Sequence, residues 1–279
     1  MIPVGFDYQR PESVDAALAL LAEHGDDATV LAGGHSLLPV MKLRLAAPEV
    51  VIDIGRLAEL NYIRVDGDGA DSYVAIGAGT RYRDIVVSDV LAKECALLPA
   101  VTRTVGDPQV RHRGTLGGAL AHGDPAGDLP AAILALEGTI VLRSPRGERK
   151  VPITEFYTGV FSSVKEPDEL IVEIRVPRTG STGWAYEKFT RRSNDWAIVA
   201  VAVVTAPDGA RRIGLVNMGS TPLRAKATEA ALAEGKSIEE AAALAAEGAE
   251  PPADNAGTPE YRRHLVTVLT RRALQTAAG

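Results

Sequence analysis

The sequence predicts an α+β protein with two N-terminal parts and a C-terminal antiparallel sheet that carries helices. Three observations lead to this prediction. Strand-like apolar runs alternate with a helical pattern in residues 1–54. Strand pairs joined by short polar turns dominate residues 55–176. A segment rich in Gly, Ser, Thr and Pro opens residues 177–279, where three strand patterns precede three helical ones, so we expect three parts with these bounds.

The first part reads as a small β-α-β unit. Ser13 is the expected N-cap of a helix that ends at Gly25. The apolar residues of this helix follow i, i+3, i+4, i+7 spacing: Val14, Ala17, Leu18 and Leu21. Strands are expected at residues 28–32 and 49–54, on either side of a glycine turn.

The second and third parts are assigned from the same signals. Helices are expected from Thr80, as an N-cap, over 90–105 and over 129–136. The expected strands of the second part are 62–65, 73–76, 138–142, 150–153 and 169–176. The third part is expected to hold strands at 185–189, 197–205 and 211–218 and helices at 223–233, 238–247 and 259–277.

Composition excludes several classes of function. Hydrophobic residues make up 46% of the 279 residues, charged residues make up 24%, and the net charge is −6. No basic run indicates nucleic acid, no apolar stretch reaches the ~20 residues of a membrane span, and no signal peptide is visible. We therefore expect a cytoplasmic protein. The single cysteine, Cys95, cannot hold an iron–sulfur cluster and is interpreted as a buried hydrophobe, and no metal site is expected.

The first candidate site is the glycine turn at 31–39, Leu-Ala-Gly-Gly-His-Ser-Leu-Leu-Pro. Gly33 and Gly34 remove side-chain bulk, permit positive φ and let a ligand approach the backbone. Successive free N–H groups in such a turn form an anion-binding nest, which suits a diphosphate. A plain tight turn between two elements explains this stretch equally well.

Two further glycine-rich stretches follow. Residues 113–130 contain two prolines and many glycines, and loops of this kind are often functional. Asp128 there could cap the helix that follows it or contact a ligand. The Gly77-Ala78-Gly79 stretch lacks the third glycine of a dinucleotide fingerprint and the acidic residue that should follow, so a Rossmann fold is rejected. Ala78 is kept as a residue whose backbone could line a ligand.

Taken together, these stretches resemble the FAD-binding medium subunit of the molybdenum hydroxylases, in particular of the carbon monoxide dehydrogenase type. The similarity runs over nearly the full length. The similarity rests on the following residues: Phe6-Asp7-Tyr8 with Pro11, residues 32–39, residues 115–118, residues 124–130, and Lys188 with Arg191, Arg192 and Asp195-Trp196-Ala197. Each is weak alone, but in this order they are specific.

The resemblance implies a fold of the vanillyl-alcohol-oxidase-like (PCMH-type) superfamily, with one non-covalently bound FAD between residues 1–54 and 55–176. It assigns the diphosphate to the turn at Gly33 and a role beside the isoalloxazine ring to Lys188, where a cation stabilises the anionic reduced flavin. With Ala78, the expected cofactor-binding residues are Ala32, Gly33, Gly34, His35, Ser36, Leu37, Ala78, Val105, Thr115, Gly118, Ala119, Asp128, Ile171 and Lys188. No catalytic acid–base residue is expected.

The resemblance also implies partners. A large subunit would carry the molybdenum cofactor and oxidise the substrate, and a small subunit would carry two [2Fe–2S] clusters. This chain would pass electrons through FAD to a quinone, NAD or a carrier protein. The expected assembly is a dimer of heterotrimers, which could associate peripherally with the inner face of the cytoplasmic membrane. The identity of the substrate stays open.

Two other interpretations remain. The first is a self-contained FAD-dependent reductase of the same superfamily that uses NAD(P)H, for which the sequence offers no convincing nicotinamide site. The second is a nucleotide-binding or assembly module that has lost its flavin. The segment 189–196 is expected either to lie by the flavin or to be a solvated turn whose Trp196 enters the C-terminal core.

Overall fold

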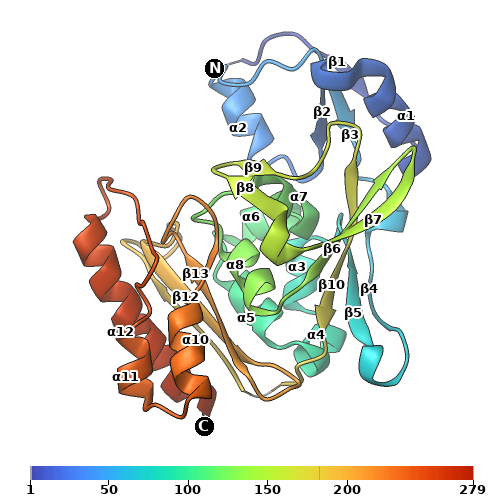
Figure 1. Cartoon of the computed structure of the whole chain (residues 1–279). Coiled ribbons are helices and arrows are strands. Elements are labelled where there is room, and N and C mark those ends of the chain that lie inside the picture. Colours follow the sequence, from blue (N-terminus) through green and yellow to red (C-terminus); the bar gives the residue numbers. More distant parts are fainter. Residues whose placement is uncertain (1, 182, 279) are drawn as a thin grey trace.

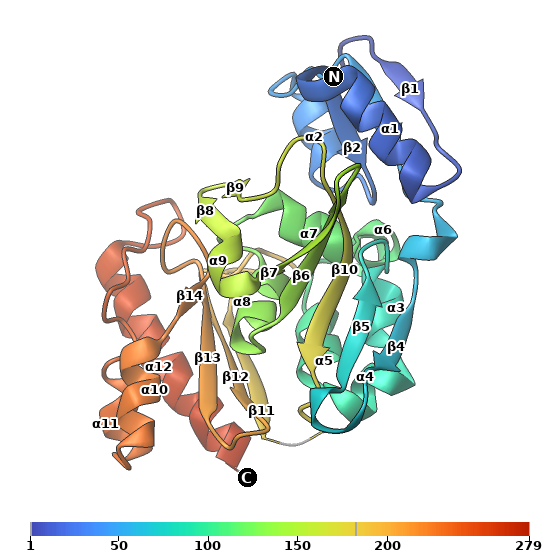
Figure 2. The ribbon, with the colours of Figure 1, turned by 45° about the vertical axis from the view of Figure 1, so that its right-hand side comes forward.

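The computed structural model of the chain describes residues 2–181 and 183–278, so Thr182, within the predicted linker, lies outside the described residues. Three main sheets follow one another along the chain, and helices fill the space between the second and third (Figures 1 and 2). No helix in these ranges combines the length and the apolarity that a membrane crossing requires.

The N-terminal part is a parallel sheet in the order β1-β3-β2. Its strands are β1 (Asp7–Gln9), β2 (Ala28–Leu31) and β3 (Val50–Asp53), and its helices are α1 (Val14–His24) and α2 (Leu37–Lys42). The Ser13 side chain accepts from the Ala16 N–H and Gly25 ends α1, as predicted. Strand β1 was not predicted, because its residues are all exposed and only its pairing with β3 makes it a strand.

The second sheet is antiparallel, in the order β4-β5-β10-β6-β7. Its strands are β4 (Ile63–Asp66), β5 (Tyr73–Gly77), β6 (Thr139–Ser144), β7 (Gly147–Pro152) and β10 (Leu170–Pro177). The hairpin β8 (Tyr157–Gly159) and β9 (Ser162–Ser163) and the helix α9 (Ile153–Phe156) lie between β7 and β10 in the chain. The other helices of this part are α3 (Tyr82–Val86), α4 (Asp89–Glu94), α5 (Leu97–Arg103), α6 (Pro108–Arg113), α7 (Leu116–His122) and α8 (Asp128–Ala135).

Two helix predictions for this part are wrong in detail. The helix predicted over 90–105 is split at Cys95, because the Ala96 N–H donates to the Gly180 carbonyl and turns the chain out of the helical path. Thr80 is no N-cap: α3 begins after Arg81, and the Thr80 hydroxyl donates to the Tyr62 carbonyl instead.

The third sheet is antiparallel in the order β11-β12-β13-β14, with three helices on its outer face (Figure 1). Its strands are β11 (Trp184–Phe189), β12 (Val199–Thr205), β13 (Arg211–Val216) and β14 (Leu223–Arg224), and the helices are α10 (Lys226–Ala233), α11 (Ile238–Ala242) and α12 (Pro259–Ala278). The helix predicted over 223–233 therefore starts as a short edge strand, and α11 is shorter than predicted. Three 3-10 turns complete the description: Gly25–Asp27, Ala58–Leu60 and Gly69–Asp71.

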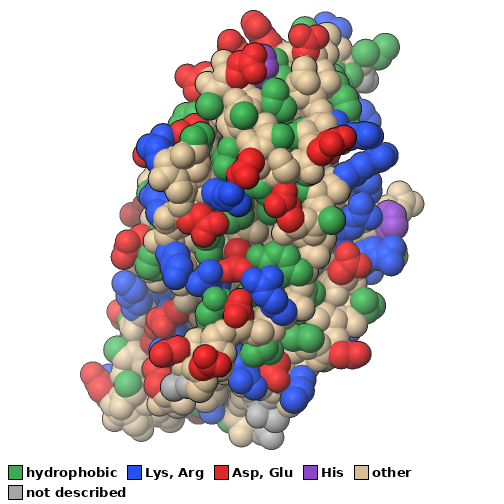
Figure 3. Space-filling model, turned by 90° about the vertical axis from the view of Figure 1, so that its right-hand side faces the viewer, with side chains coloured by type: hydrophobic (Ala, Val, Ile, Leu, Met, Phe, Trp, Pro, Cys, Tyr) green, Lys and Arg blue, Asp and Glu red, His purple; other side chains and the backbone are tan. Residues whose placement is uncertain are grey.

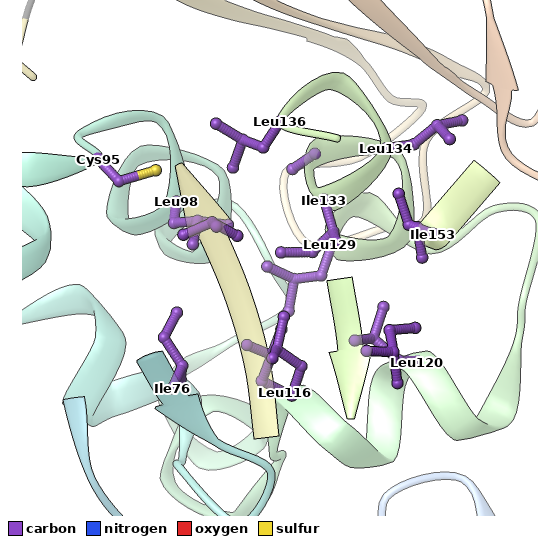
Figure 4. Packing of buried hydrophobic residues seen from close by; sticks show 14 of the residues in the cluster. Ile76, Cys95, Leu98, Leu116, Leu120, Leu129, Ile133, Leu134, Leu136 and Ile153 are labelled. Atoms are coloured by element: carbon purple, nitrogen blue, oxygen red, sulfur yellow. The ribbon is translucent and has the colours of Figure 1, made fainter. Parts of the chain in front are cut away.

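Helix α8 joins the second and third sheets. Every residue of α8 is buried. It can approach β13 closely because Gly214 has no side chain, and a Cβ there would meet the Ala131 carbonyl oxygen at 2.1 Å. On its other side, α8 packs with α5 and α7 in the largest apolar cluster (Figure 4). Cys95 belongs to this cluster with 0% exposure, and burial raises the pKa of its thiol to about 12, so the buried-hydrophobe interpretation is confirmed.

Figure 3 shows the face that lies at the right of Figure 1; acidic and basic side chains are interspersed over most of it, and several Lys and Arg side chains gather along its upper right edge. Oppositely charged side chains pair on the second sheet: Arg64 pairs with Asp66 at 3.2 Å and Arg175 with Glu173 at 2.5 Å.

Candidate functional site

One pocket lies where the first sheet meets the second, and its volume is about 320 Å³. We call it the principal pocket because most of the predicted cofactor-binding residues line it. Its walls come from the turn after β2, the end of β5, the start of α7 and the start of β10. Eleven of the predicted cofactor-binding residues line it: Ala32, Gly33, Gly34, His35, Ser36, Leu37, Ala78, Thr115, Gly118, Ala119 and Ile171. The fold thus brings residues from four distant segments to one cavity of the size of a small-molecule site, roughly 300–1,000 Å³.

The first glycine turn presents free backbone donors to this pocket. In residues 2–181 and 183–278, no protein acceptor receives a hydrogen bond from the N–H groups of Gly33, Gly34, His35 or Ser36. None of these four residues is buried, so their N–H groups are accessible from the pocket, and such a row suits a ligand with several acceptor oxygens.

The two glycines serve this turn for different reasons. Gly34 has a φ of +77°, which disfavours any side chain, as predicted. Gly33 has no positive φ; a Cβ at this position would instead meet the Arg113 carbonyl oxygen at 2.3 Å. Gly33 is therefore a contact point between the N-terminal part and the segment that leads into α7.

The second glycine stretch is fixed to the end of β5 by backbone bonds. Leu116 N–H donates to the Thr80 carbonyl at 3.0 Å, and Gly117 N–H donates to the Ala78 carbonyl at 2.8 Å. Gly117 permits this approach, since a Cβ there would meet the Ala78 Cβ at 2.5 Å. The Thr115 hydroxyl caps α7 by accepting from the Gly118 N–H at 3.2 Å. This wall therefore offers fewer free donors than the first turn.

Three of the predicted residues do not line the principal pocket: Val105, Asp128 and Lys188. Val105 packs against the main apolar cluster. Asp128 and Lys188 form a buried ion pair, with Nζ and Oδ2 2.8 Å apart and side chains 6% and 9% exposed. The Tyr186 hydroxyl donates to the other carboxylate oxygen, Oδ1.

The capping role considered for Asp128 is wrong. Gly127 is the N-cap of α8 and makes no side-chain cap bond, while the Asp128 carboxylate points to β11. Burial raises the pKa of Asp128, and the Lys188 ammonium and the Tyr186 hydroxyl oppose that shift. Lys188 also donates to the Thr104 carbonyl at 3.3 Å. A buried cation held in this way can stabilise negative charge that develops next to it.

The loop between β11 and β12 lies beside this pair. Lys188 borders a second cavity, of about 350 Å³, whose walls include Arg103, Arg111 and the loop residue Asp195. Trp196 in the same loop is 70% exposed, and its indole N–H donates to Asp124 Oδ2 at 3.2 Å. The alternative in which Trp196 enters the C-terminal core is therefore wrong.

Several residues near these cavities were not predicted from the sequence, among them Tyr186, Lys165 and Glu169. Tyr186 is two residues before Lys188 on β11, so strand alternation places both on one face, and this signal was available. Lys165 and Glu169 line the principal pocket from the segment before β10. No motif marks these two residues, because only the path of the segment after β9 brings them there.

Two known protein families match the chain. Residues 4–179 match the family described as FAD binding domain in molybdopterin dehydrogenase. Residues 184–277 match the family described as CO dehydrogenase flavoprotein C-terminal domain. The two matches cover nearly the whole chain.

Two relatives match over nearly their full lengths. The chain is 43% identical to the carbon monoxide dehydrogenase medium chain of Hydrogenophaga pseudoflava, covering 99% of this chain and 98% of that one. It is 37% identical to the glyceraldehyde dehydrogenase medium chain of Sulfolobus acidocaldarius, covering 100% of both.

Solved structures show the same architecture. The carbon monoxide dehydrogenase from Hydrogenophaga pseudoflava that lacks the Mo-pyranopterin moiety matches with a TM-score of 0.93 at 44% identity, over 100% of this chain and 99% of that chain. Quinoline 2-oxidoreductase from Pseudomonas putida 86 matches with a TM-score of 0.90 at 30% identity, over 100% of this chain and 98% of that chain.

Proposed function

The chain belongs to the family of FAD-binding medium subunits of molybdenum hydroxylases, of the carbon monoxide dehydrogenase type, and from this premise we propose that it relays electrons through FAD inside a larger oxidoreductase. The observation that carries the proposal is the row of four adjacent free backbone donors from Gly33 to Ser36. These donors open into the pocket between the first and second sheets.

The residues present fit a dinucleotide. We assign the diphosphate to the free N–H groups of the first turn, where the missing side chain of Gly34 keeps the backbone accessible. Thr115 and Gly118 bound the opposite wall, and Ile171 supplies an apolar contact at the start of β10. Residues 1–54 and 55–176 each contribute one wall, in keeping with the proposed division into two cofactor-binding parts.

The chain's own contribution to redox chemistry is electrostatic. When bound, FAD supplies a group that can accept electrons singly and release them to an acceptor. We assign Lys188 to the isoalloxazine end of the site, where its charge, held by Asp128 and the Thr104 carbonyl, favours an anionic reduced ring. The loop that contains Trp196 borders the cavity beside Lys188, and we propose that it controls the approach of the acceptor.

We propose that the electrons come from partner subunits. Relatives named as medium chains of dehydrogenases imply a large subunit with the molybdenum cofactor and a small subunit with two [2Fe–2S] clusters. The proposed assembly is a dimer of heterotrimers that delivers electrons to a quinone, NAD or a carrier protein. The substrate is chosen by the large subunit, so residues of this chain do not define it.

Rapid mixing of the intact complex with its substrate tests this proposal. Iron–sulfur and flavin absorbance should bleach together, whereas the chain alone should show no bleaching. Acid precipitation should release FAD into the supernatant, since the cofactor is held by non-covalent contacts. Oxidation of the substrate by the purified chain, free of molybdenum and iron, would contradict the relay. Fast reduction of its flavin by NAD(P)H with release of a small-molecule product would favour the self-contained reductase.

A further inference from the structure

The segment between β9 and β10 passes the principal pocket. Figure 2 shows it running from the β8–β9 hairpin past the N-terminal part to the start of β10. Lys165 and Glu169 from this segment line the pocket together with the first glycine turn. These two charged residues are therefore close to the place where the cofactor is proposed to bind.

The acidic side chains of this segment are already paired with arginines. Arg146 bonds Glu166 at 2.6 Å and Asp168 at 2.5 Å. Arg149 holds the buried Glu169 with two bonds, of 2.6 and 2.8 Å, and its guanidinium also donates to the Val164 carbonyl at 2.7 Å. The negative charges of the segment are thus neutralised by the β6–β7 hairpin, and its backbone is fixed there.

Lys165 is paired differently. Its ammonium donates to two backbone carbonyls, of Glu166 at 2.8 Å and of Glu169 at 3.3 Å. No carboxylate lies within ion-pair distance of it in the described part of the chain. An ammonium has three N–H donors, so one remains. Burial lowers the pKa of Lys165, while Glu169 and Asp168 oppose that shift, as expected for a half-buried ammonium without a direct counterion.

The pocket lacks any other Lys or Arg among its lining residues. A dinucleotide diphosphate carries two negative charges, and backbone N–H groups supply only partial positive charge to it. We propose that Lys165 is the countercharge of the FAD diphosphate and donates its remaining N–H to a phosphate oxygen. This inference rests on the proposed FAD site and adds to it a side chain that the glycine motifs do not include.

Fragments of FAD distinguish the contribution of the diphosphate to binding from that of the adenosine. We would remove flavin from the full-length chain and measure the binding of FAD, ADP and adenosine by calorimetry. Lys165→Met should weaken ADP and FAD binding by on the order of ten- to a hundred-fold, as for the loss of a charge-assisted bond, and leave adenosine binding unchanged. Lys165→Arg should retain most of the affinity for ADP.

Lys42→Met is the matched control, since exposed Lys42 on α2 is near the same turn but does not line the pocket. It removes the same net charge and should leave ADP binding unchanged. Equal ADP affinity in Lys165→Met and Lys42→Met, equal losses for ADP and adenosine, or equal losses in Lys165→Met and Lys165→Arg would each overturn the assignment. Failure of the wild-type chain to bind FAD would contradict the proposed function itself.

Discussion

The first glycine turn and the Asp128–Lys188 pair serve the proposed site by opposite means. The turn offers backbone N–H groups and requires glycine, because a Cβ on Gly33 would meet the Arg113 carbonyl oxygen at 2.3 Å. The pair offers side-chain charge and requires both side chains, because each charged group is buried and is neutralised by the other. We therefore expect that adding a side chain to the turn disrupts the proposed site, and that removing one charged group of the pair disrupts it as well.

The largest effect should come from adding atoms to the turn. Gly33→Val should abolish FAD binding, because the new side chain collides with the segment before α7 and blocks the approach to the free N–H groups. Flavin absorbance of the purified chain measures this. Gly5→Val is the control, because a Cβ on Gly5 meets nothing within 4 Å. Normal flavin content in Gly33→Val would contradict the assignment of the diphosphate to this turn.

Removing the Lys188 ammonium should lower the free energy of unfolding as well as impair function. Lys188→Met leaves the Asp128 carboxylate buried without its counterion, which costs about 3–5 kcal/mol. The double variant Lys188→Met with Asp128→Asn should recover most of this loss, because it removes the charge and leaves an acceptor for Tyr186. Urea unfolding of the two variants gives the comparison. Equal losses in both would mean that charge is not what the pair contributes.

The same variants should differ in their dependence on pH. Burial raises the pKa of Asp128 above that of the unfolded chain, and without Lys188 the rise is larger. The folded state then binds the proton more tightly than the unfolded state, so stability falls as pH rises above the unfolded pKa. The free energy of unfolding of Lys188→Met should therefore decrease between pH 5 and pH 8 relative to wild type. The double variant should show no such decrease.

A smaller effect is expected at Thr115. Thr115→Ala removes the hydroxyl that accepts from the Gly118 N–H, which corresponds to about 0.5–1.5 kcal/mol. Thr115→Ser keeps the hydroxyl and should behave as wild type. Thermal unfolding and the FAD dissociation constant measure the two effects. A loss as complete as that of Gly33→Val would mean that this wall holds the cofactor by more than a helix cap.

The smallest effect on stability should come from Trp196, which is 70% exposed. Trp196→Ala should change the free energy of unfolding by less than about 0.5 kcal/mol. It should change the rate of flavin reoxidation by the acceptor more than the rate of flavin reduction by the partner subunits. An unchanged rate of flavin reoxidation in Trp196→Ala with several acceptors would favour the interpretation of the loop as a solvated turn.

The sequence by itself determined the elements with local causes. Ser13 and Gly25 bound α1 because a cap bond and a helix stop involve neighbouring residues. The first glycine turn was also predictable, because the freedom of Gly34 at positive φ needs no distant partner. Most of the eleven predicted residues that line the pocket belong to the two glycine-rich motifs, whereas Ile171 was predicted from the family resemblance alone.

Only the tertiary structure decided what depends on distant segments. The break at Cys95 follows from the pairing of Ala96 with Gly180, far away in the chain. Asp128 became the partner of Lys188 and Tyr186 rather than a helix cap because α8 packs against the third sheet. Lys165 reached the pocket because arginines of the β6–β7 hairpin hold its segment there. Ion pairs between distant segments leave no periodic pattern in the sequence, since only the packed fold brings the two charges together.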